Sequence, residues 1–239
     1  MPMDMTAKAH TEYICSAEEF NQILKRFPAD NCFHLSLVVP YNTGTRIGET
    51  FAIDLSQDVD FEKHELRIHG QMQKVEKTWY IKPPKYDSYR TIKMGETLEK
   101  ELKFAIQQRR INKLKYGGAY SKTYLLPDRS IAQIRADIDV PYKEILPLCV
   151  KENGALLTPD SFKYCARIIH YELNNPLFHA HCLRHTHGTI LAENGVNPKT
   201  VMERLGHKDI TTTLQTYTFN TDAMQQTAVD VFENAIQTQ

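Results

Sequence analysis

The period of the hydrophobic pattern changes twice along this chain, and the change limits its fold class. Before residue 58 and after residue 95, apolar residues recur every three or four positions, as they do on the buried face of a helix. Between residues 58 and 94 they occur instead in short alternating runs, at 66–68, 78–81 and 90–92, which are typical of strands. The pattern therefore predicts one mainly α domain with a small antiparallel β-sheet, an α+β class.

Capping signals mark the ends of the predicted helices. Ser16 and Glu19 form an S-x-x-E capping box that opens one helix. Thr158 and Pro159 open another, with the proline at its first position. Further helices are expected at 33–41, near 50, at 96–115, 181–193 and 198–206, beyond 209, and at 222–236. Residues 120–150 have no clear period, and we expect loops with short helices there.

Length and composition place the chain among globular proteins. Its 239 residues are 41% hydrophobic and 24% charged, which is ordinary for such a protein. No apolar run approaches the ~20 residues that a membrane helix needs, and the N-terminus lacks the apolar segment of a signal peptide. The five cysteines are scattered, without a C-x-x-C pair. These features predict no membrane association and reduced cysteines in the cytoplasm.

The 29 basic and 29 acidic side chains give a net charge of zero, which at first argues against a nucleic-acid partner. Their uneven distribution weakens this argument. Residues 102–127 contain six basic residues and no acid, and residues 74–93 contain six basic residues against two acids. Since a basic run is usually only a solvated face, charge alone leaves both a DNA-binding surface and an ordinary surface open.

Three motifs carry residues of chemical use. A T-G-x-R motif ends at Arg46 and has Glu49 three residues later, which by itself is also typical of an ordinary turn with an ion pair. An H-x-x-R-H motif spans residues 181–185 and invites a zinc site, but its spacing is not H-E-x-x-H and no third ligand is evident. An L-G-H motif at 205–207 is followed by T-T-x-x-x-Y, which ends at Tyr217.

Taken together in chain order, with Lys85 in an expected hairpin turn between two strands, these motifs resemble the tyrosine recombinase (phage integrase) family. They are most similar to the integrases of conjugative transposons and integrative mobile elements. The resemblance implies a tyrosine recombinase catalytic-domain fold over residues 12–239, with the C-terminal helix at about 222–236 and residues 1–11 as a leader. It also implies that the family's N-terminal core-binding and arm-binding domains are absent, so we expect weak DNA binding.

The resemblance also implies a reaction that uses no metal and no cofactor. A tyrosine attacks a DNA phosphodiester and forms a 3′-phosphotyrosine, and the 5′-hydroxyl of a partner strand then reverses the step. Two arginines bind the nonbridging oxygens, a lysine protonates the leaving oxygen, and two histidines assist. The residues that match these roles are Arg46, Lys85, His181, Arg184, His207 and Tyr217, with Glu49 in support.

The partners implied are double-stranded DNA core sites and other protomers of a synaptic tetramer. The C-terminal helix is expected to pack either on a neighbouring protomer or on its own chain. The candidate DNA contacts are Lys74, Lys77, Lys82, Arg90, Lys103, Arg109, Arg110, Lys113, Lys115 and Lys122. One departure is Tyr86, which follows Lys85 where the family often has threonine.

Three alternatives to a recombinase remain at this point. A type IB topoisomerase has the same catalytic residue types, although the L-G-H and T-T-x-x-x-Y ending favours a recombinase. A catalytically silent DNA-binding regulator would not need the full set of catalytic residues. A zinc hydrolase would use the histidine cluster and would require bound metal.

Overall fold

The structure is a computed structural model that describes residues 13–209 and 222–237. The helices are α1 (Ala17–Arg26), α2 (His34–Thr43), α3 (Ile47–Ala52), α4 (Glu96–Tyr116), α5 (Pro159–Glu172), α6 (Ala180–Glu193), α7 (Pro198–Leu205) and α9 (Asp222–Gln237). The strands are β1 (Val59–Asp60), β2 (Glu65–Ile68), β3 (Gln71–Val75), β4 (Thr78–Lys82), β5 (Arg90–Lys93), β6 (Ser121–Leu125), β7 (Ile131–Arg135) and β8 (Lys143–Ile145). The helical and strand regions match the predicted α+β class.

The strands of the described residues form three small antiparallel sheets rather than one. Their orders are β1-β2-β5, β3-β4 and β7-β6-β8. The prediction of loops with short helices at 120–150 is wrong, because β6, β7 and β8 lie there. Only Thr123 and Tyr124 of β6 are buried, and they are adjacent, so this strand shows no alternation of buried and exposed residues in the sequence.

The predicted hairpin between the runs 78–81 and 90–92 is also wrong. β4 pairs with β3 through a tight turn, and β5 pairs with β2 in a different sheet. The strand β3, which the sequence pattern did not reveal, takes the place beside β4. Lys85 therefore lies in a connection between two sheets, where residues Lys85–Asp87 form a short 3₁₀ turn.

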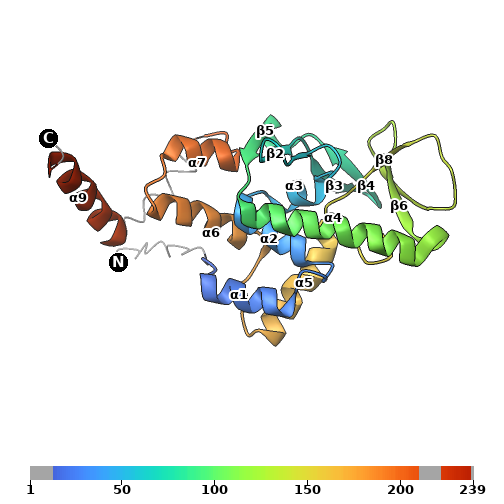
Figure 1. The fold of residues 1–239 in the computed structure, drawn as a ribbon, viewed down its shortest axis with the longest axis horizontal. Helices are drawn as coiled ribbons and strands as arrows, with labels where there is room; N and C mark the ends of the chain where they lie inside the picture. Colours follow the sequence, from blue (N-terminus) through green and yellow to red (C-terminus); the bar gives the residue numbers. More distant parts are fainter. Residues whose placement is uncertain (1–12, 210–221, 238–239) are drawn as a thin grey trace, which may run out of the picture.

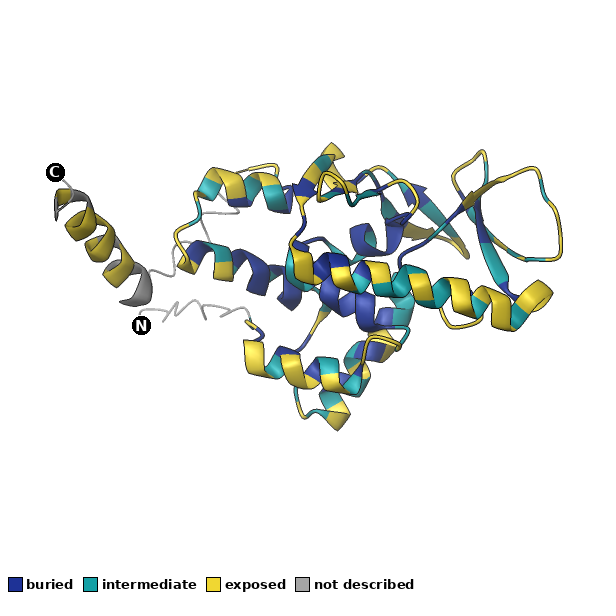
Figure 2. Cartoon of the chain, viewed as in Figure 1, coloured by how far each residue is buried: buried dark blue, intermediate teal, exposed yellow. Residues whose placement is uncertain are grey.

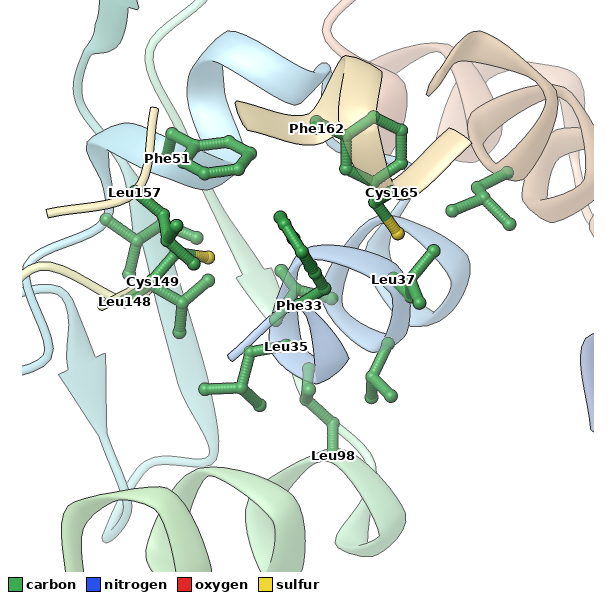
Figure 3. Close-up of a cluster of buried hydrophobic side chains, with 14 of the residues drawn as sticks. Phe33, Leu35, Leu37, Phe51, Leu98, Leu148, Cys149, Leu157, Phe162 and Cys165 are labelled. Carbon is green, nitrogen blue, oxygen red and sulfur yellow. The ribbon is translucent and has the colours of Figure 1, made fainter. Parts of the chain in front are cut away.

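The core is built around α2, which is buried over most of its surface. Leu37, Val38 and Val39 are at most 2% exposed. A helix that is apolar all round must be enclosed by other elements, and α4 and α5 cover α2 with side chains such as Leu98 and Phe162 (Figure 3). This packing fixes the C-terminal end of α2, from which the T-G-x-R motif continues.

The two ends of the long axis differ in character. Sheet β7-β6-β8 lies at one end, and α6, α7 and then α9 lie toward the other (Figure 1). The part of α9 whose burial is described is exposed (Figure 2), and it includes Val229, Val231, Phe232 and Ile236, each more than half exposed. In the part of the chain that the structure describes, no helix is both long enough and apolar enough to cross a membrane.

Candidate active site

Arg46 lies at the N-terminus of α3, where the T-G-x-R motif meets the helix. Its backbone N–H donates to Glu49 Oε2 (2.9 Å), and its Nη1 donates to Glu49 Oε1 (2.8 Å). Gly44 has a left-handed conformation with φ of +69°, which ends α2 and lets the chain turn toward α3. The predicted pairing of Arg46 with Glu49 is therefore present, and both groups are held by local geometry.

Glu49 is the central carboxylate of the site and is 1% exposed. Arg90, at the start of β5, also binds it, with Nη2 2.8 Å from Glu49 Oε2. Burial alone would raise the pKa of Glu49, but the hydrogen bonds and charges of Arg90 and Arg46 outweigh it and hold the pKa below its usual range. One buried carboxylate thus orients two guanidinium groups.

Arg184 projects from α6 and is 4% exposed. Its Nη1 donates to two backbone carbonyls, Gly44 O and Leu205 O, each at 2.7 Å. Burial, together with the nearby cations Arg46 and Arg90, lowers the pKa of Arg184 to about 9. Among the residues that the structure describes, no acceptor reaches Nη2 of Arg184, although this atom is buried. A buried donor of this kind normally has a partner, so its acceptor is to be sought outside the described residues.

The end of α7 joins these arginines to the L-G-H motif. Gly206 ends the helix with φ of +67°, as expected for a glycine at this position. Leu205 O accepts from Arg184, and Gly206 O accepts from Arg46 Nη2 at 3.1 Å. The two arginines therefore contact consecutive carbonyl groups, and His207 is the next residue along the chain.

The histidines of the site are held neutral by their surroundings. Partial burial and the charges of Arg184 and Arg46 lower the pKa of His207 to about 4. Burial and neighbouring groups, first His185 and then Arg184, also lower the pKa of His181, whose ring reaches the surface of the protein. A neutral imidazole keeps one N–H donor and one acceptor nitrogen, which suits proton transfer or phosphate binding.

A partly buried network around Arg204 was not predicted from the sequence. Arg204, the residue before the L-G-H motif, donates from Nε to His187 Nε2 at 2.9 Å. Its Nη1 donates to Lys93 O and its Nη2 to Asn42 O, both at 3.1 Å. Arg204 therefore joins α7 to α6, to β5 and to the end of α2. The only signal in the sequence was the position of a basic residue in the last turn of the helix that precedes the motif.

Five of the six predicted catalytic residues lie in the part of the chain that the structure describes. Arg46, Arg184 and His207 meet at the ends of α2 and α7, and His181 lies one turn before Arg184 on α6. Lys85 lies on the connection that precedes Arg90. Tyr217 and the helix predicted after Asp209 lie outside the described residues.

Two of the predicted DNA contacts, Arg90 and Arg109, make hydrogen bonds within the protein. Arg90 is bound to Glu49, to Arg204 O and to Ser88 O. Arg109 of α4 is half-buried and donates from Nη2 to Pro147 O, and burial lowers its pKa. Both guanidiniums therefore already have partners within the protein, and their contact with DNA stays a prediction.

Acids from other elements accompany the basic run, although the run itself contains none. Glu144 of β8 lies 3.4 Å from Lys122 and 3.9 Å from Lys113, and Glu152 pairs with Lys115. Lys103 pairs with Glu99, and Lys74 pairs with Asp160. Each of these acids reduces the net charge that its lysine offers to a phosphate. Within the described ranges, no ion pair engages Lys77, Lys82 or Arg110.

The histidine cluster on α6 does not assemble a metal site within the described ranges. His181 and His185 lie one turn apart, with ring centroids 5.9 Å apart and an edge-to-face arrangement. No group of three potential ligands occurs in residues 13–209 and 222–237. This part of the chain therefore contains no set of three ligands that a zinc hydrolase would use.

Residues 15–224 match the model of the phage integrase family. A "Tyrosine recombinase XerC-like" protein of Caldanaerobacter subterraneus subsp. tengcongensis is 28% identical and aligns over 92% of this chain and 53% of its own length. The transposase from transposon Tn916 of Enterococcus faecalis is 26% identical, over 85% of this chain and 47% of its own. The chain thus spans about half the length of these curated relatives.

Solved structures agree in fold. The Tn1549 transposon integrase in complex with transposon right end DNA superposes with a TM-score of 0.69 at 21% identity, over 95% of this chain and 67% of that chain. The XerA recombinase superposes with a TM-score of 0.60 at 19% identity, over 95% of this chain and 66% of that chain. The matched residues, the motifs and the fold lead to one conclusion: the chain belongs to the phage integrase family, whose members are the tyrosine recombinases.

Proposed function

We propose that this chain is the catalytic part of a site-specific DNA recombinase that cleaves and rejoins DNA through Tyr217. The observation that carries the proposal is the buried Nη2 donor of Arg184, which lacks a partner among the described residues and lies beside Arg46 and His207. A nonbridging phosphate oxygen supplies the acceptor that this donor lacks. Relatives that the chain resembles are named as recombinases, integrases and transposases, which supports the same reaction.

In the proposed reaction, the Tyr217 oxygen forms a bond to phosphorus while the bond to the 5′-oxygen breaks. Negative charge grows on the nonbridging oxygens, and Arg46 and Arg184 bind those oxygens with paired donors. The guanidinium of Arg46 is oriented for this by Glu49. Because Arg184 has a pKa of about 9, it is charged at neutral pH, and a bound phosphate stabilises that charge further.

Three further side chains assist, two by proton transfer and one by a hydrogen bond. The tyrosine hydroxyl must lose its proton, and the neutral imidazole of His181 is a suitable acceptor. His207 donates an N–H to a nonbridging oxygen. Lys85 gives a proton to the leaving 5′-oxygen. In the second half of the reaction, a 5′-hydroxyl attacks the phosphotyrosine and these transfers are reversed.

We further propose that double-stranded DNA lies over the face that carries Lys85. Among the predicted DNA contacts, those without an ion pair in the described residues, namely Lys77, Lys82 and Arg110, are the first candidates for phosphate contacts. The exposed apolar side chains of α9 suit packing on a neighbouring protomer, as in a synaptic tetramer. A DNA duplex and neighbouring protomers placed in this way would allow strand exchange rather than simple hydrolysis.

A covalent-capture experiment with randomised DNA tests the function and finds the target sequence at the same time. The protein is incubated with a library of duplexes that have a randomised core and a nick beside it, so that cleavage releases a short fragment and traps the protein on DNA. Complexes that resist SDS and are sensitive to protease are recovered and sequenced. We expect an enriched sequence, a covalent link at Tyr217 and an unchanged yield in EDTA, because guanidinium groups rather than a metal bind the phosphate in this mechanism.

Variants decide between the possible outcomes. Tyr217→Phe is expected to abolish the complex, and Arg184→Ala is expected to abolish cleavage while most DNA binding remains. A complex that forms with Tyr217→Phe, or that EDTA abolishes, contradicts the mechanism. Relaxation of supercoiled DNA without sequence enrichment supports a topoisomerase instead, and binding without any covalent complex supports a silent regulator.

A further inference from the structure

The connection that carries Lys85 has a backbone held by hydrogen bonds. At its start, Gln71 Nε2 donates to Pro83 O at 3.0 Å. At its end, Arg90 Nη1 donates to Ser88 O at 3.1 Å, and Ser88 Oγ in turn donates to Lys85 O at 2.9 Å. These bonds hold the backbone and leave the flexible side chain of Lys85 to be positioned by something else.

The ring of Tyr86 lies close to two lysines from different segments. Lys85 Nζ is 4.9 Å from the ring centroid, and Lys208 Nζ, on the segment after the L-G-H motif, is 5.9 Å from it. Both distances fall within the range of cation–π attraction. Because Lys208 directly follows His207, the ring links the Lys85 connection to the segment that presents the histidine.

Burial does not explain why the ring is there. Tyr86 is 58% exposed. Its backbone has a φ of +62°, and that of Asp87 is +52°, a left-handed conformation that residues other than glycine rarely adopt. Two consecutive residues are thus held in an uncommon conformation that places an exposed aromatic ring beside two cations. Such strain persists where the surrounding contacts require it, and it is frequent at functional sites.

We propose that Tyr86 is a positioning residue for Lys85. Its ring attracts both ammonium groups and offsets their mutual repulsion, so that Lys85 stays beside the His207 segment, where the leaving 5′-oxygen would be protonated. This inference rests on the proposed function, since it assigns Tyr86 a role through the proton donor of that reaction. The aromatic ring, rather than the tyrosine hydroxyl, is the group that matters.

Leaving-group chemistry separates this role from a general effect on folding or DNA binding. An alkoxide is the anion of an acid about as weak as water (pKa ~15.7), so it needs a proton as it leaves. A thiol has a pKa of ~8.5, so a sulfur leaving group departs without help. A duplex with sulfur in place of the scissile 5′-oxygen therefore bypasses the proton donor and every residue that positions it.

The experiment measures single-turnover cleavage of the captured duplex, with either oxygen or sulfur at the scissile 5′ position. Tyr86→Leu keeps an apolar side chain and the same backbone requirement but removes the π-face. We expect it to cleave the oxygen substrate roughly five- to thirtyfold more slowly, which corresponds to the loss of two exposed cation–π contacts, and to match the unmodified protein on the sulfur substrate. Tyr86→Phe keeps the ring and is expected to behave normally on both.

Each remaining outcome has a defined meaning. A Tyr86→Leu protein that is equally slow on both substrates, or slow on neither, overturns the positioning role. Lys85→Ala is the control for the proposed function, because it should be slow with oxygen and recover with sulfur. If Lys85→Ala does not recover, the role of Lys85 as proton donor fails and this inference fails with it. If Lys85→Ala recovers and Tyr86→Leu does not, only the inference on Tyr86 is overturned.

Discussion

Acid is expected to destabilise this protein through His187, because the two hydrogen bonds of its ring require a neutral imidazole. Arg204 Nε is always a donor, so His187 Nε2 must accept from it. The proton of the neutral ring is then on Nδ1, which donates to Tyr41 O at 2.9 Å. Protonation of Nε2 removes this acceptor and places a second cation against the guanidinium of Arg204.

The magnitude follows from the pKa of the folded state. Burial, together with the charge of Arg204, lowers the pKa of His187 from 6.5 to about 4. In the window between these two values the unfolded chain binds a proton that the folded chain does not, so stability is complete above pH ~6.5 and falls as the pH is lowered. A shift of this size corresponds to about 3 kcal/mol, lost at roughly 1.4 kcal/mol per pH unit. That is a large share of the ~5–15 kcal/mol of a typical domain.

Urea unfolding at pH 7, 6, 5 and 4.5 measures this directly when the protein is compared with His187→Gln. The amide of glutamine stays neutral throughout this range, so the variant lacks the titration of His187 but keeps every other acid-sensitive group. We expect the free energy of unfolding to fall more steeply with acid in the unmodified protein, by about 1 kcal/mol per pH unit. Identical slopes in the two proteins would refute the assignment of a neutral, buried His187.

Three further predictions concern the site and its surroundings. Glu49→Gln leaves the guanidiniums of Arg46 and Arg90 without their buried carboxylate and should lower the free energy of unfolding by ~3–5 kcal/mol in chemical denaturation. Gly206→Ala places a Cβ 2.7 Å from Arg90 Nη1 at a positive φ, so it should lower the free energy of unfolding by at least ~1 kcal/mol and slow cleavage. Gly95→Ala is the control, because no atom lies within 4 Å of its added Cβ. It should change the free energy of unfolding by less than ~0.5 kcal/mol. Lys82→Ala should reduce the slope of log affinity for DNA against log salt by about 0.9, while Lys115→Ala, whose charge is paired with Glu152, should leave it nearly unchanged.

The parts of the fold that depend on neighbouring residues were predicted well from the sequence. The capping box of Ser16 and Glu19 and the proline at the start of α5 are local signals, and the structure has helices that begin at these points. Strand pairing is not local, because the partner of β5 is β2 rather than the preceding strand. The hairpin expected around Lys85 was wrong for this reason.

The site divides in the same way. The resemblance of the motifs to the family identified Arg46, Glu49, Arg184 and His207, which the structure brings together. It did not reveal the contact of Arg204 with His187, which are 17 positions apart. It also did not reveal Glu144, which approaches two lysines of a run that looks free of acid in the sequence. Both features depend on which elements pack together, and the residues adjacent in the sequence do not determine this packing.

The acceptors that hold the two site arginines have an electrostatic consequence. Gly44 O lies at the C-terminal end of α2, and Leu205 O and Gly206 O lie at that of α7. The C-terminal end of a helix carries a partial negative charge from its aligned peptide dipoles, and this attracts cations without adding a formal charge. The ends of two helices thus anchor Arg46 and Arg184. Among the described residues, Glu49 is the one carboxylate bonded to either arginine, and it bonds to Arg46. An anchor of two or three carboxylates would hold the same side chains, but it would cancel the positive field that draws an anion into the site.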